Sequence, residues 1–264
     1  MKSSRKFVND VGIVRKYSED RFKLVALRVY RMKGIEDDKK HTAKGEAGNE
    51  EKLSNNIIRT KRRIFDLAMC NPWEWYVTLT LDDKKQDRND LQKYIKDLGQ
   101  FVRNYKRKNN VDIKYLLVPE LHQKGGWHLH GFFMNIKQDD LRELTLNQKL
   151  PYAIRKELQN GRKLYSWVQY SERFGYTCIE RIESQEKISS YITKYITKNS
   201  VSTIKELNLH SFYASQGLQE PEFVACDLLQ KEVDNPAFEN EYCAIKWFRD
   251  KNEALAYVNT EKGL

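Results

Sequence analysis

The sequence predicts an α+β fold with a central antiparallel sheet and packed helices, and three observations support this. Residues 75–81 (WYVTLTL) alternate along the chain as a strand does, with Tyr76, Thr78 and Thr80 on one face. Two further apolar runs read as strands, and the glycine pair between them predicts a hairpin turn. Between the first strand and this hairpin, apolar side chains recur at helical spacing, which predicts a helix with one apolar face. The hairpin strands are 113–120 and 127–134, and the helix is 91–105.

The N-terminal part of the chain gives weaker signals. Residues 22–30 fit either a strand or a short buried helix. Residues 33–52 are charged, contain glycine and have almost no apolar side chains, so we expect a mobile surface loop. Residues 53–69 predict a helix that ends at Asn71-Pro72.

The second half of the chain continues the α+β pattern. Residues 137–160 are polar and predict helical structure, and residues 166–170 fit more than one element. Residues 176–182 follow a glycine and predict a fourth strand, and residues 186–199 predict a helix.

Composition and charge restrict the class of protein. The chain has 264 residues, 40% of them hydrophobic, which suffices for one folded domain with extensions. Its net charge of +10 favours a polyanionic partner. A membrane surface fits this less well than nucleic acid, because there is no apolar run of about 18 residues and no apolar core of a signal peptide. The four cysteines lack any CxxC spacing, so we expect free thiols and a cytoplasmic setting.

A candidate metal site is predicted on the hairpin. His128 and His130 point the same way from their strand, because side chains alternate between the two faces. A divalent ion bound by two imidazoles needs a further ligand, often a carboxylate. The glycine turn would bring Glu120 alongside the histidines, and His122, nearer the turn, suits an outer position. The alternative is that these are ordinary strand residues, since a lone His-x-His pair is a weak signal.

A candidate nucleophile is predicted on the helix 186–199. Tyr191 and Tyr195 are one helical turn apart and therefore share a face. Because isoleucines from Ile188 onward follow the same spacing, the tyrosines also fit a simple apolar core face. However, Lys194 and Lys198 each follow a tyrosine by three residues. An ammonium beside a phenol favours the phenolate and pairs with phosphate oxygens, so the duplicated Tyr-x-x-Lys unit favours catalysis.

Taken together, these residues make the chain resemble the two-tyrosine HUH endonucleases, the rolling-circle replication initiators (Rep proteins) of small single-stranded-DNA phages and related plasmids. Residues 77–80 match the first motif of that family, residues 120–130 its metal motif and residues 191–198 its tyrosine motif, in the family's order. Residues 212–221 are similar to the stretch that closes the catalytic domain in phage-type initiators. The resemblance covers about residues 73–221.

The resemblance implies a fold and a domain division. The fold would be a ferredoxin/RRM-like HUH core, an antiparallel sheet of about five strands with helices mainly on one face. The metal motif would lie on its central strands and the tyrosine helix across them. The expected division is a basic, partly helical N-terminal extension (1–70) of unknown role, an endonuclease domain (71–221) and a C-terminal extension (222–264).

The resemblance also implies a reaction. His128, His130 and Glu120 would hold Mg²⁺ or Mn²⁺, which polarises the scissile phosphate. One tyrosine would attack single-stranded origin DNA, leaving a 5′-phosphotyrosyl link and a free 3′-hydroxyl primer, and the second would act after a round of synthesis to rejoin strands. A polymerase and a helicase of the bacterial host are the expected partners, because the chain has no GxxxxGK[ST] helicase motif.

Basic residues outside the catalytic motifs are candidates for gripping the DNA strand, with Trp127 or Tyr76 as a stacking platform. The alternative is that these charge runs are solvated surface. The basic candidates are Lys61, Arg62, Arg63, Arg103, Lys106, Arg107 and Lys108, together with Arg162 and Lys163.

Other functions remain open from the sequence. A conjugative relaxase or a two-tyrosine transposase would use the same chemistry, although relaxases generally present three histidines and an N-terminal tyrosine. A non-catalytic nucleic-acid-binding protein on the same scaffold would bind without metal and form no covalent product. A structural zinc module lacks the required cysteine spacing.

Overall fold

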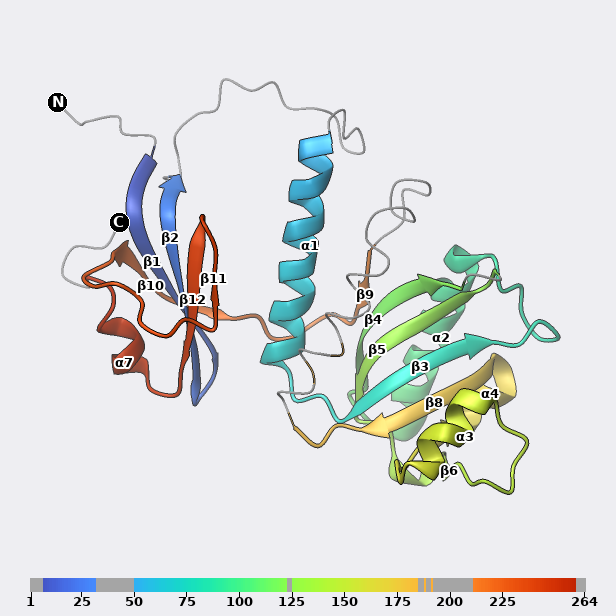
Figure 1. Ribbon diagram of the computed structural model, residues 1–264. Coiled ribbons are helices and arrows are strands. Elements are labelled where there is room, and N and C mark those ends of the chain that lie inside the picture. Colours follow the sequence, from blue (N-terminus) through green and yellow to red (C-terminus); the bar gives the residue numbers. More distant parts are fainter. Residues whose placement is uncertain are drawn as a thin grey trace. The chain divides into compact units, whose positions relative to one another are not determined.

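The computed structural model describes residues 7–31, 50–122, 125–184, 188, 191 and 211–259 (Figure 1). The chain forms two compact units, one from residues 1–47 with 219–264 and one from residues 48–218. Each unit has its own antiparallel sheet. The predicted α+β class is confirmed, with two sheets where one was expected.

The first unit is a five-stranded sheet built from both ends of the chain. Val14 and Leu24 pack on one face of this sheet with Ala254 and Tyr257, which belong to or follow the short helix α7 (Lys251–Leu255). The Asp250 carboxylate caps this helix by accepting from two backbone N–H groups. The strand order is β10 (Glu222–Leu228), β1 (Phe7–Ser18), β2 (Arg21–Arg31), β12 (Cys243–Phe248) and β11 (Phe238–Glu239).

This sheet answers one open question and changes the division of the chain. Residues 22–30 lie within strand β2. The two terminal segments, expected to be separate extensions, pair directly, with Val11 opposite Leu228. The helix expected in the N-terminal extension belongs instead to the second unit. Pairing between segments so far apart in sequence depends on packing, and local periodicity carries no signal for it.

The second unit contains a seven-stranded sheet in which every neighbouring pair is antiparallel. The predicted strands 75–81, 113–120, 127–134 and 176–182 are all present, and the predicted hairpin is confirmed. The sheet has more than the expected strands because three short ones extend its edges. The order is β6 (Leu141–Glu143), β7 (Tyr165–Trp167), β8 (Gly175–Arg181), β3 (Trp75–Leu81), β5 (Trp127–Met134), β4 (Lys114–Leu121) and β9 (Tyr213–Ala214).

The helices of the second unit follow the sequence signals in most places. Helix α1 (Glu50–Cys70) and helix α2 (Leu91–Asn109) are those predicted, and the Asp90 carboxylate caps α2 by accepting from the Lys93 N–H. Residues 137–160, expected to be helical, are so only in part. They contain a 3₁₀ turn (Gln138–Asp140), the strand β6 and helix α3 (Tyr152–Gln159). Leu141 is buried, so packing favours strand pairing there.

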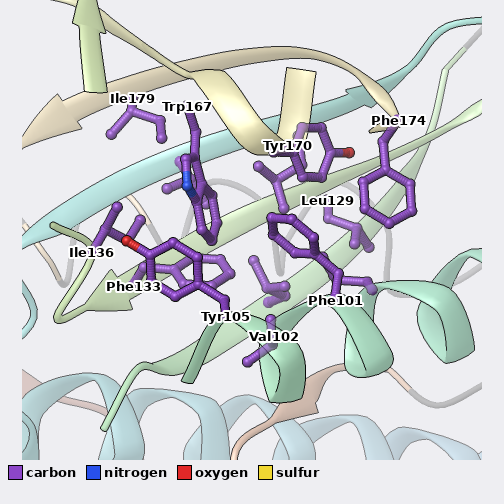
Figure 2. Packing of buried hydrophobic residues seen from close by; sticks show 14 of the residues in the cluster. Phe101, Val102, Tyr105, Leu129, Phe133, Ile136, Trp167, Tyr170, Phe174 and Ile179 are labelled. Carbon is purple, nitrogen blue, oxygen red and sulfur yellow. The ribbon is translucent and has the colours of Figure 1, made fainter. Parts of the chain in front are cut away.

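One face of this sheet carries the main core. Phe101 and Tyr105 of α2 meet Phe133 of β5, Trp167 and Tyr170 (Figure 2). Tyr170 belongs to helix α4 (Val168–Arg173), which begins in the stretch that the sequence left open. The buried hydroxyls of Tyr94 and Tyr170 share a hydrogen bond. This core fixes the sheet and hence the side chains on its other face.

The opposite face is covered in part by α1. Ile64 and Leu67 of α1 pack with Tyr76, Phe132 and Ile188 of the sheet and the predicted tyrosine helix. Helices therefore lie on both faces, and the expectation of helices mainly on one face is wrong. Of residues 186–199, only 188 and 191 are described, and both are helical. The expected loop 33–52 lies almost wholly outside the described residues.

Among the residues that the structure describes, no helix is long and apolar enough to cross a membrane.

Candidate functional site

Polar side chains gather on the α1 face of the second sheet, beyond its apolar patch. Thr78 of β3 pairs with His130 of β5, and Thr80 pairs with His128. Glu120 of β4 pairs with His128 from the other side. Residues paired across neighbouring strands point to the same face. Three central strands therefore bring the predicted metal ligands together, next to two threonines from the motif 77–80.

The threonines orient the two imidazole rings. Thr78 Oγ1 and His130 Nδ1 share a hydrogen bond at 3.1 Å, and Thr80 Oγ1 and His128 Nδ1 share one at 3.0 Å. The two nitrogens of an imidazole point in nearly opposite directions, so both Nε2 atoms point away from β3, toward β4. A polar partner at Nδ1 is the usual support of a metal-binding histidine, because it fixes the ring and leaves Nε2 for the ligand.

Glu120 and His130 have the spacing of two ligands of one ion. His130 Nε2 lies 2.8 Å from Glu120 Oε2, and both side chains are largely buried. Two atoms each about 2.1 Å from an octahedral ion, at a right angle, are about 3.0 Å apart. An imidazole nitrogen with a carboxylate oxygen also suits Mn²⁺ or Mg²⁺ chemically. This pair therefore fits two coordination positions.

His128 does not complete that set in this structure. Its ring is parallel to that of His130, with 6.2 Å between centroids and 8° between planes. Parallel rings with the same orientation place their Nε2 atoms about as far apart as their centroids. Ligands on one ion are at most about 4.2 Å apart. Accordingly, no group of three His, Cys, Asp or Glu side chains within the described residues is arranged to hold an ion. His128 must rotate toward Glu120 to bind.

The electrostatic environment keeps His128 neutral. Burial lowers the pKa of His128 to about 4, and positive charge on His130, His122 and Arg88 lowers it further while Glu120 opposes the shift. Metal binding requires the neutral imidazole, so His128 is in the correct state near neutral pH. His122 is exposed, with its ring centroid 5.5 Å from that of His128.

Arg88 joins this site from the loop between β3 and α2, and the sequence reasoning missed it. Its guanidinium lies against Gly126, where a Cβ atom would come within 2.7 Å of Arg88 Nε. The Arg88 carbonyl accepts from the Trp127 N–H at 2.9 Å, which holds the loop at the start of β5. Arg88 sits in a polar run without periodicity, so no sequence pattern distinguishes it from its neighbours. Arg88 and three histidines against one carboxylate favour an anionic ligand such as a phosphate.

The structure places Tyr191 at a different point of the same face. Its ring stacks on Tyr76, with 4.4 Å between centroids. Its hydroxyl accepts from Arg162 Nη2 at 3.0 Å and lies 3.3 Å from Glu180 Oε2 of strand β8. Arg162, a DNA-binding candidate, is thus engaged with Glu180, Tyr191 and Glu157. The predicted residues Lys194, Tyr195 and Lys198 lie outside the described residues.

The remaining DNA-binding candidates fall on two helices. Arg62 and Arg63 are exposed and Lys61 partly so on α1, the helix on the histidine side of the sheet. The four basic candidates of α2 are exposed on the helix that covers the other side. These four are Arg103, Lys106, Arg107 and Lys108. The structure does not bring this second group together with the histidines.

Trp127 is a correction. It is 4% exposed within the main core, and its indole N–H donates to the Asn89 carbonyl at 3.1 Å. It precedes His128 on the strand and therefore points to the opposite face. Trp127 supports the sheet and cannot stack on a base from this position. Tyr76 is likewise buried, beneath Tyr191.

Comparison with known proteins gives one match. Residues 74–200 match a family model described as Replication-associated protein, of the ORF2 type. Neither a search of curated proteins nor a search of solved structures gives a significant match. The matched segment contains the Thr78, His128, His130 and Glu120 side chains and the tyrosine motif. Over this segment the chain is similar to replication-associated proteins, and this supports a role in replication initiation with DNA as its partner.

Proposed function

We propose that the protein is a replication initiator that nicks single-stranded origin DNA through a tyrosine and later rejoins strands. The observation that carries this proposal is the Glu120–His130 pair on adjacent central strands, with Thr78 behind the imidazole. A structural ion pair in a sheet needs no second histidine and no threonine at each Nδ1. The similarity to replication-associated proteins gives the biological setting.

Glu120, His130 and, after rotation, His128 would hold Mg²⁺ or Mn²⁺. When bound, such an ion supplies Lewis-acid polarisation of the scissile phosphate. Thr78 and Thr80 hold the imidazoles in the orientation that leaves each Nε2 free for a ligand. Arg88, beside Gly126, would contact an adjacent phosphate of the strand.

The covalent step would be a transesterification by Tyr191 or Tyr195. The tyrosine oxygen bonds to phosphorus, and the bond from phosphorus to the 3′-oxygen breaks. The departing oxygen takes up a proton equivalent to the one the phenol loses, which gives a free 3′-hydroxyl. A host polymerase would extend that hydroxyl, and a host helicase would open the duplex in the bacterial cytoplasm. Lys194 and Lys198 would pair with phosphate oxygens near each tyrosine.

A covalent-adduct assay tests the proposal. We would incubate the protein with end-labelled single-stranded oligonucleotides from a random pool in Mn²⁺ and separate the products on a denaturing gel. The expected result is a protein–DNA band that disappears when Tyr191→Phe and Tyr195→Phe are combined. Tyr152→Phe is the matched control, because Tyr152 is 80% exposed on α3. Salt-sensitive binding without any adduct would instead identify a non-catalytic DNA-binding protein.

A relaxase or a transposase would pass the same assay. Sequencing the trapped DNA separates these roles, because an initiator forms its adduct at one origin sequence, whereas a transposase acts at element ends.

A further inference from the structure

The hydroxyl of Tyr191 is held by two charged side chains. Arg162 Nη2 donates to the Tyr191 oxygen at 3.0 Å, and the Tyr191 hydroxyl can donate to Glu180 Oε2 at 3.3 Å. Stacking on Tyr76 fixes the ring as well. Hydrogen bonds in which one partner is ionised are stronger than neutral ones, so these contacts select one orientation of the tyrosine.

The residues that hold Tyr191 are themselves anchored. Arg162 forms an ion pair with Glu180 and a second one, at 2.8 Å, with Glu157 of α3. The Glu180 side chain is 23% exposed and that of Arg162 is 35% exposed, so the cluster is largely shielded from water. Glu180 is fixed by its strand, where it pairs with Tyr76 of β3. The holding cluster of Arg162, Glu180 and Glu157 is therefore part of the fold.

This cluster lies away from the Glu120–His130 pair. Glu180 is on β8 and His130 is on β5, with β3 between them. Strands are about 4.8 Å apart, so the two residues are separated by roughly 10 Å across the sheet. A nucleophile must come within about 3–3.5 Å of the phosphorus it attacks. The Tyr191 hydroxyl must leave Arg162 and Glu180 before it can reach a phosphate at the metal pair.

We propose that Arg162 and Glu180 are positioning residues that hold Tyr191 back, so that the first cleavage falls to Tyr195. This inference rests on the proposed function. In the first step the Tyr195 oxygen bonds to phosphorus and the 3′-oxygen leaves with a proton. Tyr191 takes the same role in the later step, after its hydroxyl has left the cluster. Charge-assisted hydrogen bonds of this kind correspond to a preference of at least about tenfold for Tyr195.

The test measures which tyrosine carries the first adduct. Wild-type protein reacts once with a cleavable single-stranded oligonucleotide in Mn²⁺, nuclease trims the DNA, and mass spectrometry quantifies the nucleotide on each tyrosine peptide. We expect Tyr195 to exceed Tyr191 by at least about tenfold. Glu180→Gln and Arg162→Gln should each raise the share of Tyr191. Because both peptides come from the same molecules, partial loss of folding changes the yield and leaves the ratio intact.

Controls separate this inference from the proposed function. Arg155→Gln removes an exposed arginine from the same helix as Glu157 and should leave the ratio unchanged. Equal adducts in wild type, or a ratio unaffected by both cluster variants, overturns the inference and leaves the proposed function standing. No adduct on either tyrosine overturns both. In a Tyr195→Phe background, Glu180→Gln should speed adduct formation, whereas a slower reaction would mean that Glu180 activates Tyr191 as a base.

Discussion

His130 Nε2 lies 2.8 Å from Glu120 Oε2, while His130 Nδ1 shares a hydrogen bond with Thr78 on the opposite side of the ring. The imidazole is thus held between two strands, β3 and β4, by one partner on each. This arrangement sets the direction of the Nε2 atom through the register of the sheet, without help from any loop. A metal pair built on central strands is preorganised, and the consequences can be measured.

Thr78 should control metal affinity. Thr78→Val keeps the side-chain shape but removes the hydroxyl at His130 Nδ1, so the ring loses its orientation. We expect Mn²⁺ binding to weaken by about 10- to 100-fold, measured by titration calorimetry. Thr145→Val, at an exposed position, is the matched control. An unchanged affinity in Thr78→Val would show that the threonine does not support a metal ligand.

Arg88 should contribute one phosphate contact. Arg88→Ala is expected to weaken binding of single-stranded DNA for all sequences alike, and to reduce the slope of log K against log salt by about 0.7. Lys84→Ala is the control, since Lys84 is exposed on the same loop. Fluorescence anisotropy at several salt concentrations measures both. If the two variants behave alike, Arg88 has no specific role in the site.

His128 should make the metal-free protein less stable in acid. Its pKa is lowered to about 4 by burial and by nearby positive charge, whereas an unfolded histidine has a pKa near 6.5. The unfolded state therefore binds more protons between these values, and the free energy of unfolding falls as the pH drops from about 6.5 toward 4.

The loss at pH 5 should be about 1 kcal/mol, because solvent screens a half-exposed ring. Urea unfolding in chelator at pH 7.5 and pH 5 measures it, and His128→Gln should lose less stability than wild type. Equal losses in the two proteins would mean that His128 titrates normally.

Gly131 should be required for the approach of β4 to β5. A Cβ atom there would lie 2.0 Å from the backbone oxygen of Leu116, and backbone cannot move aside as a side chain does. Gly131→Ala should destabilise the protein by at least about 2 kcal/mol in urea unfolding. Gly99→Ala in α2 meets nothing closer than 3.5 Å and should stabilise it by about 1 kcal/mol. Similar effects of the two substitutions would contradict this account.

The sequence predicted the strands of the site well, because the pattern is local. Alternation in residues 75–81 and 127–134 gave the bounds of β3 and β5. The same alternation shows that Trp127 faces away from His128, and proposing it as a stacking platform ignored that signal.

Other features depend on contacts that no local pattern encodes. The first unit forms when β1 pairs with β10, across most of the chain. Arg162 and Glu180 meet Tyr191 only because the register of β8 places Glu180 opposite Tyr76. Arg88 reaches the site through the path of its loop, which hydrogen-bonds to the start of β5. Register and loop path are properties of the folded chain, so these residues could not be selected from the sequence.

The yield of covalent adduct as a function of Mn²⁺ concentration tests the central claim most directly. Wild-type protein should show a saturable rise from no adduct in chelator. His130→Gln and Glu120→Gln should require at least about tenfold more Mn²⁺ or give no adduct, because each removes one coordinating atom. An adduct that forms equally in chelator, or a curve that neither substitution shifts, would contradict a metal-dependent nickase built on Glu120 and His130.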